Sequence, residues 1–150
     1  MTQAVFFEDL HPGQRIAHRR GRTVTETDNT LFALLSMNTS QAHFNEAAMR
    51  ETEFRTRLVA GVVTVSLVAG LASQEFGESV IREVALDRWR LPAPVFVGDT
   101  ITAFSEVLSV AASPCGGGLL QLRQWGLNQR DEIVCELDRT ILVARRNPVR

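Results

Sequence analysis

The stretch RLVAGVVTVSLVAGL, residues 57–71, is apolar at nearly every position. A helix that is apolar on all sides is normally buried on all sides. The β-branched residues at 62–65 also suit a strand, but the apolar stretch is longer than an ordinary strand, and this length favours a helix. We therefore expect a helix over 57–74 that is buried on every side. One face of it carries small residues that would pack closely on a sheet, namely Ser66, Ala69, Gly70 and Ser73.

The residues after Gly77 have the pattern of β-strands. Four runs rich in β-branched and apolar residues are separated by turns that contain Pro, Gly or Asn. In the last run, the apolar residues Ile133, Cys135 and Leu137 recur at every second position, which indicates a strand with one buried face. Short turns join neighbouring strands in antiparallel order. The runs that predict this antiparallel sheet cover residues 80–90, 99–110, 119–127 and 133–144.

The first part of the chain predicts smaller elements. A strand is expected over 6–22, entered through the turn His-Pro-Gly at 11–13. A helix is expected next, capped by Thr25 or Thr27 and ending near Asn38. Its apolar stripe would consist of Leu31, Leu34 and Leu35.

A short helical piece over 45–49 completes the expected elements. The total length of 150 residues suits one compact core, because a chain of this size buries roughly 70% of the surface that it exposes when unfolded. The order of elements therefore predicts a single α+β domain over residues 1–150. In this domain an antiparallel sheet wraps around one central buried helix.

The charged residues limit the classes of function. Sixteen basic and seventeen acidic residues give a net charge of −1, which argues against a nucleic-acid-binding protein. All sixteen basic residues are Arg, and the sequence contains no Lys and no Tyr. Acid–base chemistry would therefore depend on His, Asp, Glu or Cys.

Nothing in the sequence indicates a membrane protein, a secreted protein or a metal centre. The start of the chain lacks the charged and apolar regions of a signal peptide, and the longest apolar stretch is too short to span a bilayer. Cys115 and Cys135 lie apart, without the spacing of a zinc site. We expect a cytoplasmic protein with two unreactive thiols, no metal and no redox cofactor.

Three motifs follow one another along the chain: LSMNTSQAHFNEA at 35–47, RLVAGVVTVSLVAGL at 57–71 and LPAPVFVGDTI at 91–101. In order and spacing they resemble the MaoC-like dehydratases, the (R)-specific enoyl-CoA hydratases of the hotdog fold. In that family the first motif reads GDxNPxH, the second places a Gly five residues before a Ser, and the third reads PVxxGD. The resemblance implies a hotdog domain that hydrates a 2-enoyl-CoA thioester.

The resemblance also implies a set of site residues. His43 matches the family's acid–base residue, and histidine, with an ordinary pKa of about 6.5, exchanges protons readily near neutral pH. Gly61 matches the Gly whose amide would donate to the thioester oxygen. Ser66 matches the family Ser, although a small residue there also suits helix packing. The third motif, at 94–99, is interpreted as a structural turn.

One departure from the family pattern bears on activity. The family has an Asp five residues before the His, and this chain has Asn38 there, with Ser40 and Gln41 replacing the family's Asn and Pro. Because Asn accepts no proton at neutral pH, it can only orient a water molecule. Two interpretations follow: His43 activates water while Asn38 holds it, or the chain has lost the chemistry and only binds acyl-CoA.

The leading hypothesis is reversible hydration of a 2-enoyl-CoA, branched or dicarboxylic esters included, by a homodimer or higher homo-oligomer that takes the acyl chain between subunits. One alternative is a hotdog thioesterase, for which Glu51 and Glu53 lie near the helix start. Another is a non-catalytic acyl-CoA-binding subunit, or one half of a heteromeric hydratase whose partner supplies the Asp. Candidates for the CoA phosphates are Arg55, Arg57, Arg88 and Arg90.

Overall fold

A computed structural model describes residues 5–114 and 116–147. A short 3-10 helix, η1, covers Phe7–Asp9. The helices are α1 (Glu26–Leu35), α2 (Gln41–Phe44), α3 (Glu46–Arg50), α4 (Gly61–Leu71) and α5 (Ser73–Phe76). The strands are β1 (Arg15–Ala17), β2 (Arg22–Thr23), β3 (Val80–Arg90), β4 (Thr100–Ala112), β5 (Gly117–Leu127) and β6 (Ile133–Ala144).

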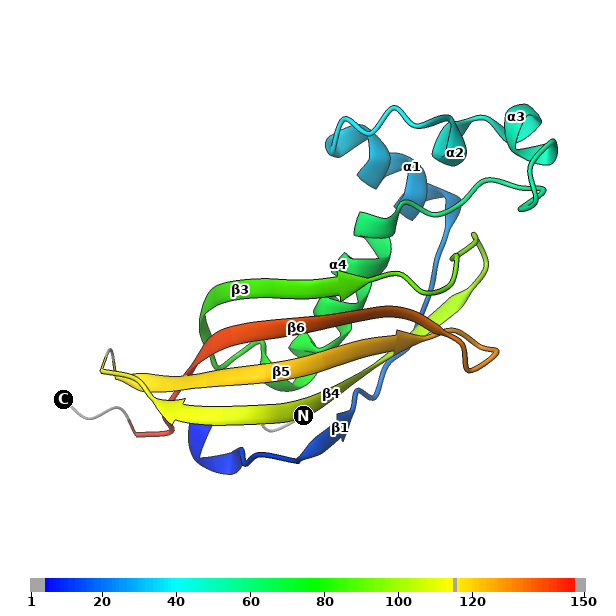
Figure 1. Cartoon of the computed structure of the whole chain (residues 1–150). Helices are drawn as coiled ribbons and strands as arrows, with labels where there is room; N and C mark the ends of the chain where they lie inside the picture. Colours follow the sequence, from blue (N-terminus) through cyan, green and yellow to red (C-terminus); the bar gives the residue numbers. More distant parts are fainter. Residues whose placement is uncertain (1–4, 115, 148–150) are drawn as a thin grey trace.

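The strands form one antiparallel sheet in the order β1-β4-β5-β6-β3, with β2 paired to β4. The sheet curves around α4, and helices α1 to α3 extend beyond one end of it (Figure 1). The predicted antiparallel sheet around a central helix is therefore confirmed. The four long strands begin and end within two residues of their predicted positions. In β4, β5 and β6 buried residues alternate with more exposed ones over much of the strand, the pattern on which such a prediction depends.

Helix α4 is shorter than predicted. It begins at Gly61 and ends at Leu71, and a separate short helix, α5, follows it. Residues 57–60 are extended because the amides of Leu58 and Val59 donate to the backbone carbonyls of Ala42 and Val95, respectively. These bonds to neighbouring segments replace the bonds that a helix would make.

The prediction that this helix is buried on every side is wrong for a single chain. Val63, Thr64 and Val68 are buried, whereas Val62, Ser66 and Gly70 are exposed along another flank. The sheet covers the helix from one side only (Figure 1). The apolar composition of the helix therefore leaves one flank uncovered.

The apolar stripe predicted for α1 is also wrong as a core-facing surface. Leu34 and Leu35 are 62% and 74% exposed, and Leu31 is exposed as well. The residues that α1 buries are Asn29 and Ala33. The reason is that α1 lies beyond the end of the sheet (Figure 1), so the sheet does not cover these leucines.

The strand predicted over 6–22 is mostly absent from the described residues. Within residues 6–22 the strand structure is limited to β1 and the start of β2, both paired with β4, and η1 replaces the first part. Between the two short strands His18 turns inward, where its Nδ1 contacts Glu75 and its Nε2 lies 2.8 Å from Ser105 Oγ. Gln124 Nε2 donates to the same hydroxyl at 2.9 Å. This buried polar cluster interrupts the strand.

The two cysteines are the thiols that the sequence predicts to be unreactive. Burial raises the pKa of the Cys135 thiol to about 11, which keeps it as an unreactive thiol at neutral pH. Cys115 lies outside the described residues. Within the described ranges, no helix combines the length and the apolar character needed to cross a membrane.

Helix α1 ends in a tight backbone turn. The Asn38 amide donates to the Ala33 carbonyl at 2.9 Å, and the Met37 amide donates to the Leu34 carbonyl at 3.0 Å. These two hydrogen bonds form the Schellman motif, in which the residue after the C-cap adopts a left-handed backbone conformation. That residue is Met37, with φ of 53°. Left-handed backbone favours Gly, so Met37 is strained there.

Replacing Met37 by Gly should therefore stabilise the protein. The side chain is 86% exposed, so its removal costs little packing, and we expect the free energy of unfolding to rise by about 1 kcal/mol. Thermal unfolding of the wild type and Met37→Gly measures the change. Met37→Ala is the matched control, since it removes the side chain but keeps the strain, and equal effects of the two substitutions would contradict the interpretation.

Candidate active site

The ring of His43 is held by one hydrogen bond to the backbone. His43 lies in the last turn of α2, and its Nδ1 is 2.9 Å from the carbonyl oxygen of Leu58. A carbonyl oxygen only accepts hydrogen bonds, so Nδ1 carries the proton in the neutral ring. The lone pair is then on Nε2, and the ring is oriented as a base.

The backbone amide of Gly61 lies in the first turn of α4, where helix geometry provides no acceptor within the helix. A β-carbon on Gly61 would lie 2.3 Å from Leu91 Cδ1. The side chain of Leu91 therefore lies directly against the start of the helix. The glycine permits this close approach and leaves its N–H available to a ligand.

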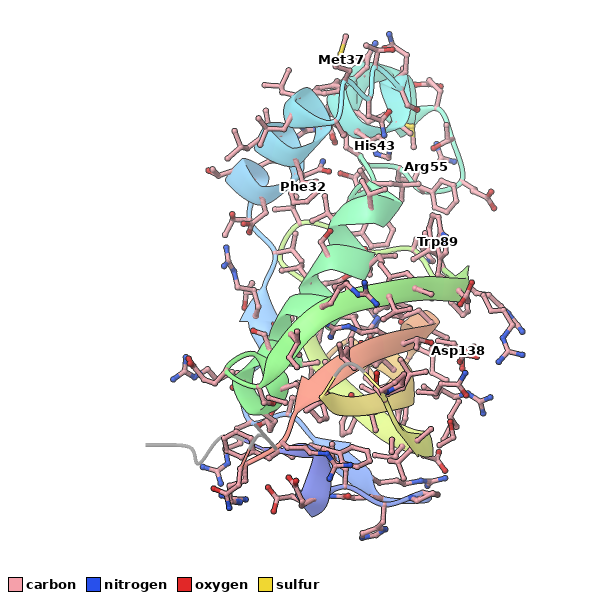
Figure 2. The ribbon with its side chains drawn as sticks, turned by 90° about the vertical axis from the view of Figure 1, so that its left-hand side faces the viewer. Phe32, Met37, His43, Arg55, Trp89 and Asp138 are labelled. Carbon is pink, nitrogen blue, oxygen red and sulfur yellow. The ribbon has the colours of Figure 1, made fainter. Side chains whose placement is uncertain are left out.

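His43 and Gly61, the residues that match the family's acid–base His and amide-donating Gly, line the same cavity. The cavity has a volume of about 400 Å³, and its walls are mainly apolar. Figure 2 shows His43 between the helices that extend beyond the sheet and the first turn of α4. The other lining residues are Phe54, Leu58, Val59, Thr64, Leu91, Pro92, Ala93, Pro94 and Val95.

Asn29 of α1 connects the segments that carry these two groups. Its side chain is fully buried, and its Oδ1 accepts from the Ala60 amide at 2.9 Å. Its Nδ2 lies 3.4 Å from the carbonyl oxygens of both His43 and Leu58. One amide thus fixes the backbone of the His43 turn and the backbone that leads into α4.

A charged cluster joins the same helices on the outside. Arg57 Nη2 donates to Glu26 of α1 at 2.5 Å, and Arg57 Nε donates to Glu46 of α3 at 3.1 Å. Hydrogen bonds from the Arg57 backbone and side chain lower the pKa of the Glu46 carboxyl, and the bond to Glu46 is the largest cause of a raised pKa for Arg57. The Glu46 carboxyl therefore stays ionised, and the ion pairs of Arg57 with Glu26 and Glu46 hold α1, α3 and the segment before α4 together.

Two predicted site residues lie outside this cavity. The side-chain oxygen of Asn38 accepts from the Ser40 amide at 3.1 Å, and its amide nitrogen has no partner among the described residues. Ser66 lines a different hollow on the exposed flank of α4, together with Arg20 and Arg22. A single chain therefore brings together His43 and Gly61 but neither Asn38 nor Ser66, and the roles of all four stay predictions.

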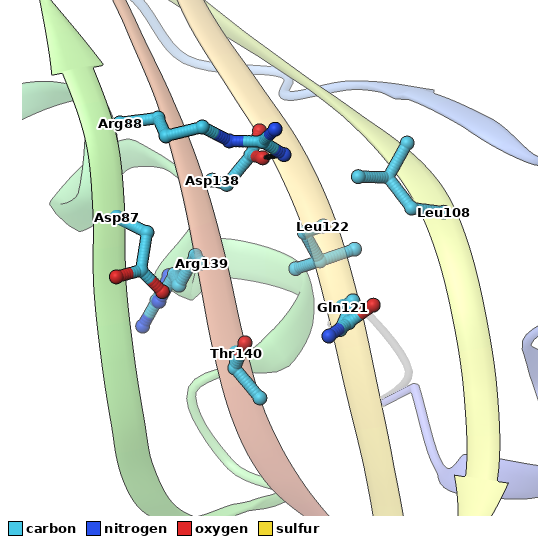
Figure 3. A pocket seen from close by; sticks show the side chains of 8 residues that line it. All are labelled: Asp87, Arg88, Leu108, Gln121, Leu122, Asp138, Arg139 and Thr140. Carbon is cyan, nitrogen blue, oxygen red and sulfur yellow. Dashed lines mark hydrogen bonds and ion pairs between the residues drawn. The ribbon is translucent and has the colours of Figure 1, made fainter.

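None of the four arginines predicted for CoA phosphates lines the cavity. Arg55 Nη1 donates to the Arg50 carbonyl at 3.0 Å, and Arg57 is bound to two carboxylates. Arg88 pairs with Asp138 in a hollow of about 340 Å³, and Arg90 lines a neighbouring hollow. Figure 3 shows Arg88 and Asp138 turned toward each other on the face of the sheet away from α4.

The sequence analysis assigned no role to the Asn29 amide or to the Thr64 hydroxyl. A single polar residue in a predicted helix carries no signal of its tertiary contacts. Thr64 was part of the quoted apolar stretch, and its position three residues after Gly61 was the available signal, because such residues share a helix face. Among residues 5–114 and 116–147, no three His, Cys, Asp or Glu side chains converge as metal ligands.

Replacing Asn29 by Ala should destabilise the protein by about 2–3 kcal/mol, since the buried Ala60 amide would lose its acceptor. Denaturant unfolding measures this change. Thr27→Ala, at an exposed position of the same helix, is the matched control and should stay within about 0.5 kcal/mol. Equal stabilities of Asn29→Ala and the control would contradict the expected contribution of the Asn29 hydrogen bonds to the free energy of unfolding.

The chain is similar to known proteins in both sequence and fold. A family profile described as MaoC like domain matches residues 8–113. The β-methylmalyl-CoA dehydratase of Chloroflexus aurantiacus is 29% identical over 157 residues, which cover 93% of this chain and 44% of that protein. The (R)-specific enoyl-CoA hydratase of Rhodospirillum rubrum is 37% identical over 101 residues, which cover 65% of this chain and 66% of that protein. The chain thus spans less than two thirds of either relative.

A solved structure from Mycobacterium tuberculosis, described as a double hotdog fold, is similar with a TM-score of 0.83 and 18% identity, over 98% of this chain and 46% of that one. This likeness confirms the predicted hotdog architecture. The family profile covers more than half of the chain. The motifs, the fold and the profile agree, and the chain belongs to the family of MaoC-like dehydratase domains.

Proposed function

We propose that this protein reversibly hydrates a 2-enoyl-CoA thioester at the cavity lined by His43 and Gly61. The observation that carries the proposal is the pairing of two groups in one apolar cavity: an imidazole whose Nε2 is free to accept a proton, and a helix-start amide free to donate a hydrogen bond. Hydration of an enoyl thioester needs both, because a base must activate water and a donor must stabilise the enolate oxygen.

In the proposed reaction, His43 Nε2 takes a proton from water as the water oxygen bonds to C3 of the acyl group. The electron pair of the C2–C3 double bond moves toward the thioester carbonyl, whose oxygen becomes negatively charged. The Gly61 amide donates to that oxygen. The protonated His43 then delivers its proton to C2, which completes the addition of one water molecule and regenerates the base.

Asn38 does not line the cavity of the single chain, so it would hold the attacking water only in a bound or assembled state that brings it beside His43. Its oxygen is occupied by the Ser40 amide, whereas its nitrogen still has two hydrogens to donate. The role is therefore one of orientation, because an amide takes up no proton at neutral pH. His43 would carry both proton transfers alone.

The substrate class is proposed from the relatives. Their names describe a β-methylmalyl-CoA dehydratase and an (R)-specific enoyl-CoA hydratase, which supports a CoA ester, branched or dicarboxylic acyl groups included. The reaction uses the CoA thioester as substrate and requires no separate cofactor. We place it in the cytoplasm, where CoA esters are handled.

A homodimer is proposed from the free edge of β3. This strand pairs with β6 on one side, and no described strand pairs with its other edge. Along it lie four apolar side chains that are about half exposed, Ile81, Val84, Leu86 and Trp89. A second copy that pairs along this edge would continue the sheet and cover them, and the acyl chain would enter between the subunits.

Purified protein should add water to crotonyl-CoA or to a branched enoyl-CoA, measured as loss of the ultraviolet absorbance of the enoyl thioester. His43→Ala should reduce kcat/KM by about 1,000-fold, the usual contribution of an acid–base residue. Circular dichroism and thermal unfolding check that the variant stays folded. Retained turnover in a folded His43→Ala variant would exclude this residue as the base.

Asn38→Asp separates the two interpretations of the departure from the family pattern. Asp keeps the acceptor oxygen for Ser40 but loses both donors, so an active Asn-type site should lose about tenfold in kcat/KM, the worth of roughly one hydrogen bond. A large gain would instead show that the chain had lost its catalytic carboxylate. A parallel assay for free CoA thiol would detect the thioesterase alternative.

A further inference from the structure

The cavity contains one polar side chain that the proposed reaction has not used. Of its eleven lining residues, His43 and Thr64 have polar side chains. Thr64 lies on α4 and is 2% exposed. Burying a hydroxyl in such an apolar wall is unfavourable unless the hydroxyl finds a hydrogen-bond partner.

The Thr64 hydroxyl has no hydrogen-bond partner among the described residues. It is also not sealed in the interior: within the same residues, the one enclosed side-chain atom without a partner is Gln124 Oε1, in the separate cluster around His18. The open space that Thr64 borders is the cavity. Its unused hydrogen-bonding capacity is therefore available to a ligand there.

Helix geometry places this hydroxyl beside the Gly61 amide. Residues three apart share one helix face, and a helical side chain leans toward the N-terminus of its helix. The Thr64 side chain thus lies over the turn that begins at Gly61. Ser66, two residues further on, is rotated by about 200° around the axis and lies in another hollow.

We propose that the Thr64 hydroxyl donates a hydrogen bond to the thioester oxygen of the substrate, next to the bond from the Gly61 amide. The inference rests on the proposed hydratase function and adds the second donor of its oxyanion site. A hydrogen bond to a charged oxygen is about twice as strong as one to a neutral oxygen. The hydroxyl would therefore act mainly on the enolate, and its loss would lower kcat more than it raises KM.

Steady-state kinetics of Thr64→Val test this role, because valine keeps the shape of threonine without its hydroxyl. We expect kcat to fall about 100-fold, as for loss of one oxyanion donor, with KM changed by less than about threefold. Thr64→Ser restores a hydroxyl and should recover most of the rate. Thr102→Val is the matched control, because β4 alternates and Thr102 points away from the buried face of Ile101 and Ala103; it should keep the wild-type rate.

Infrared difference spectroscopy of bound butyryl-CoA, labelled with ¹³C at its thioester carbonyl, provides a measurement that needs no turnover. Two donors weaken the C=O bond, so the band should lie at lower frequency in the wild type and in Thr64→Ser than in Thr64→Val. The same band position in all three proteins would overturn the inference. A wild type without hydratase activity that shows the shift would contradict the proposed reaction but support the Thr64 contact.

Wild-type activity that depends on His43 but is unchanged in Thr64→Val would overturn the Thr64 inference and leave the proposed hydratase function standing. A loss of rate in Thr64→Val that Thr64→Ser fails to recover would also count against it, since a hydroxyl is present in the latter. Thermal unfolding of both variants checks that the comparison is made between folded proteins.

Discussion

The hydrogen bonds of one buried amide determine how the cavity is built. Asn29 reaches from α1 to three backbone groups: the Ala60 amide, and the carbonyls of His43 and Leu58. The Leu58 carbonyl in turn fixes the ring of His43. Because buried polar groups are costly without partners, these bonds restrain two segments that belong to different parts of the chain. The base and the helix start are therefore placed relative to each other by the same residue.

The regular elements followed from the sequence because their signals are local. The strands at 80–90 and 133–144 were predicted at their observed ends, and His43 and Gly61, which the family motifs single out, line one cavity. The wrong predictions concern segments whose conformation or burial is determined by contacts with distant parts of the chain. Residues 57–60 are extended because they bond to distant carbonyls, and the leucines of α1 are exposed because the sheet does not extend beneath them.

The turn before α2 shows how the family architecture persists through changed residues. Met37 and Asn38 stand where the family pattern has Gly and Asp, yet the bonds that close the turn come from backbone amides to Ala33 and Leu34. Hydrogen bonds between backbone groups do not require a particular side chain, although the left-handed φ of Met37 is strained for a residue other than Gly. The site could therefore keep its shape while its acid–base groups changed, which is why the sequence alone left both interpretations open.

The uncovered edge of β3 has a consequence for handling the protein. A long strand that has an unpaired edge and four half-exposed apolar side chains is a template for pairing with another extended chain. During synthesis or refolding, correct self-association must compete with disordered aggregation, and both are favoured by higher concentration. The protein should therefore be refolded by slow dilution out of denaturant at low protein concentration. It should be concentrated gradually only after it has folded.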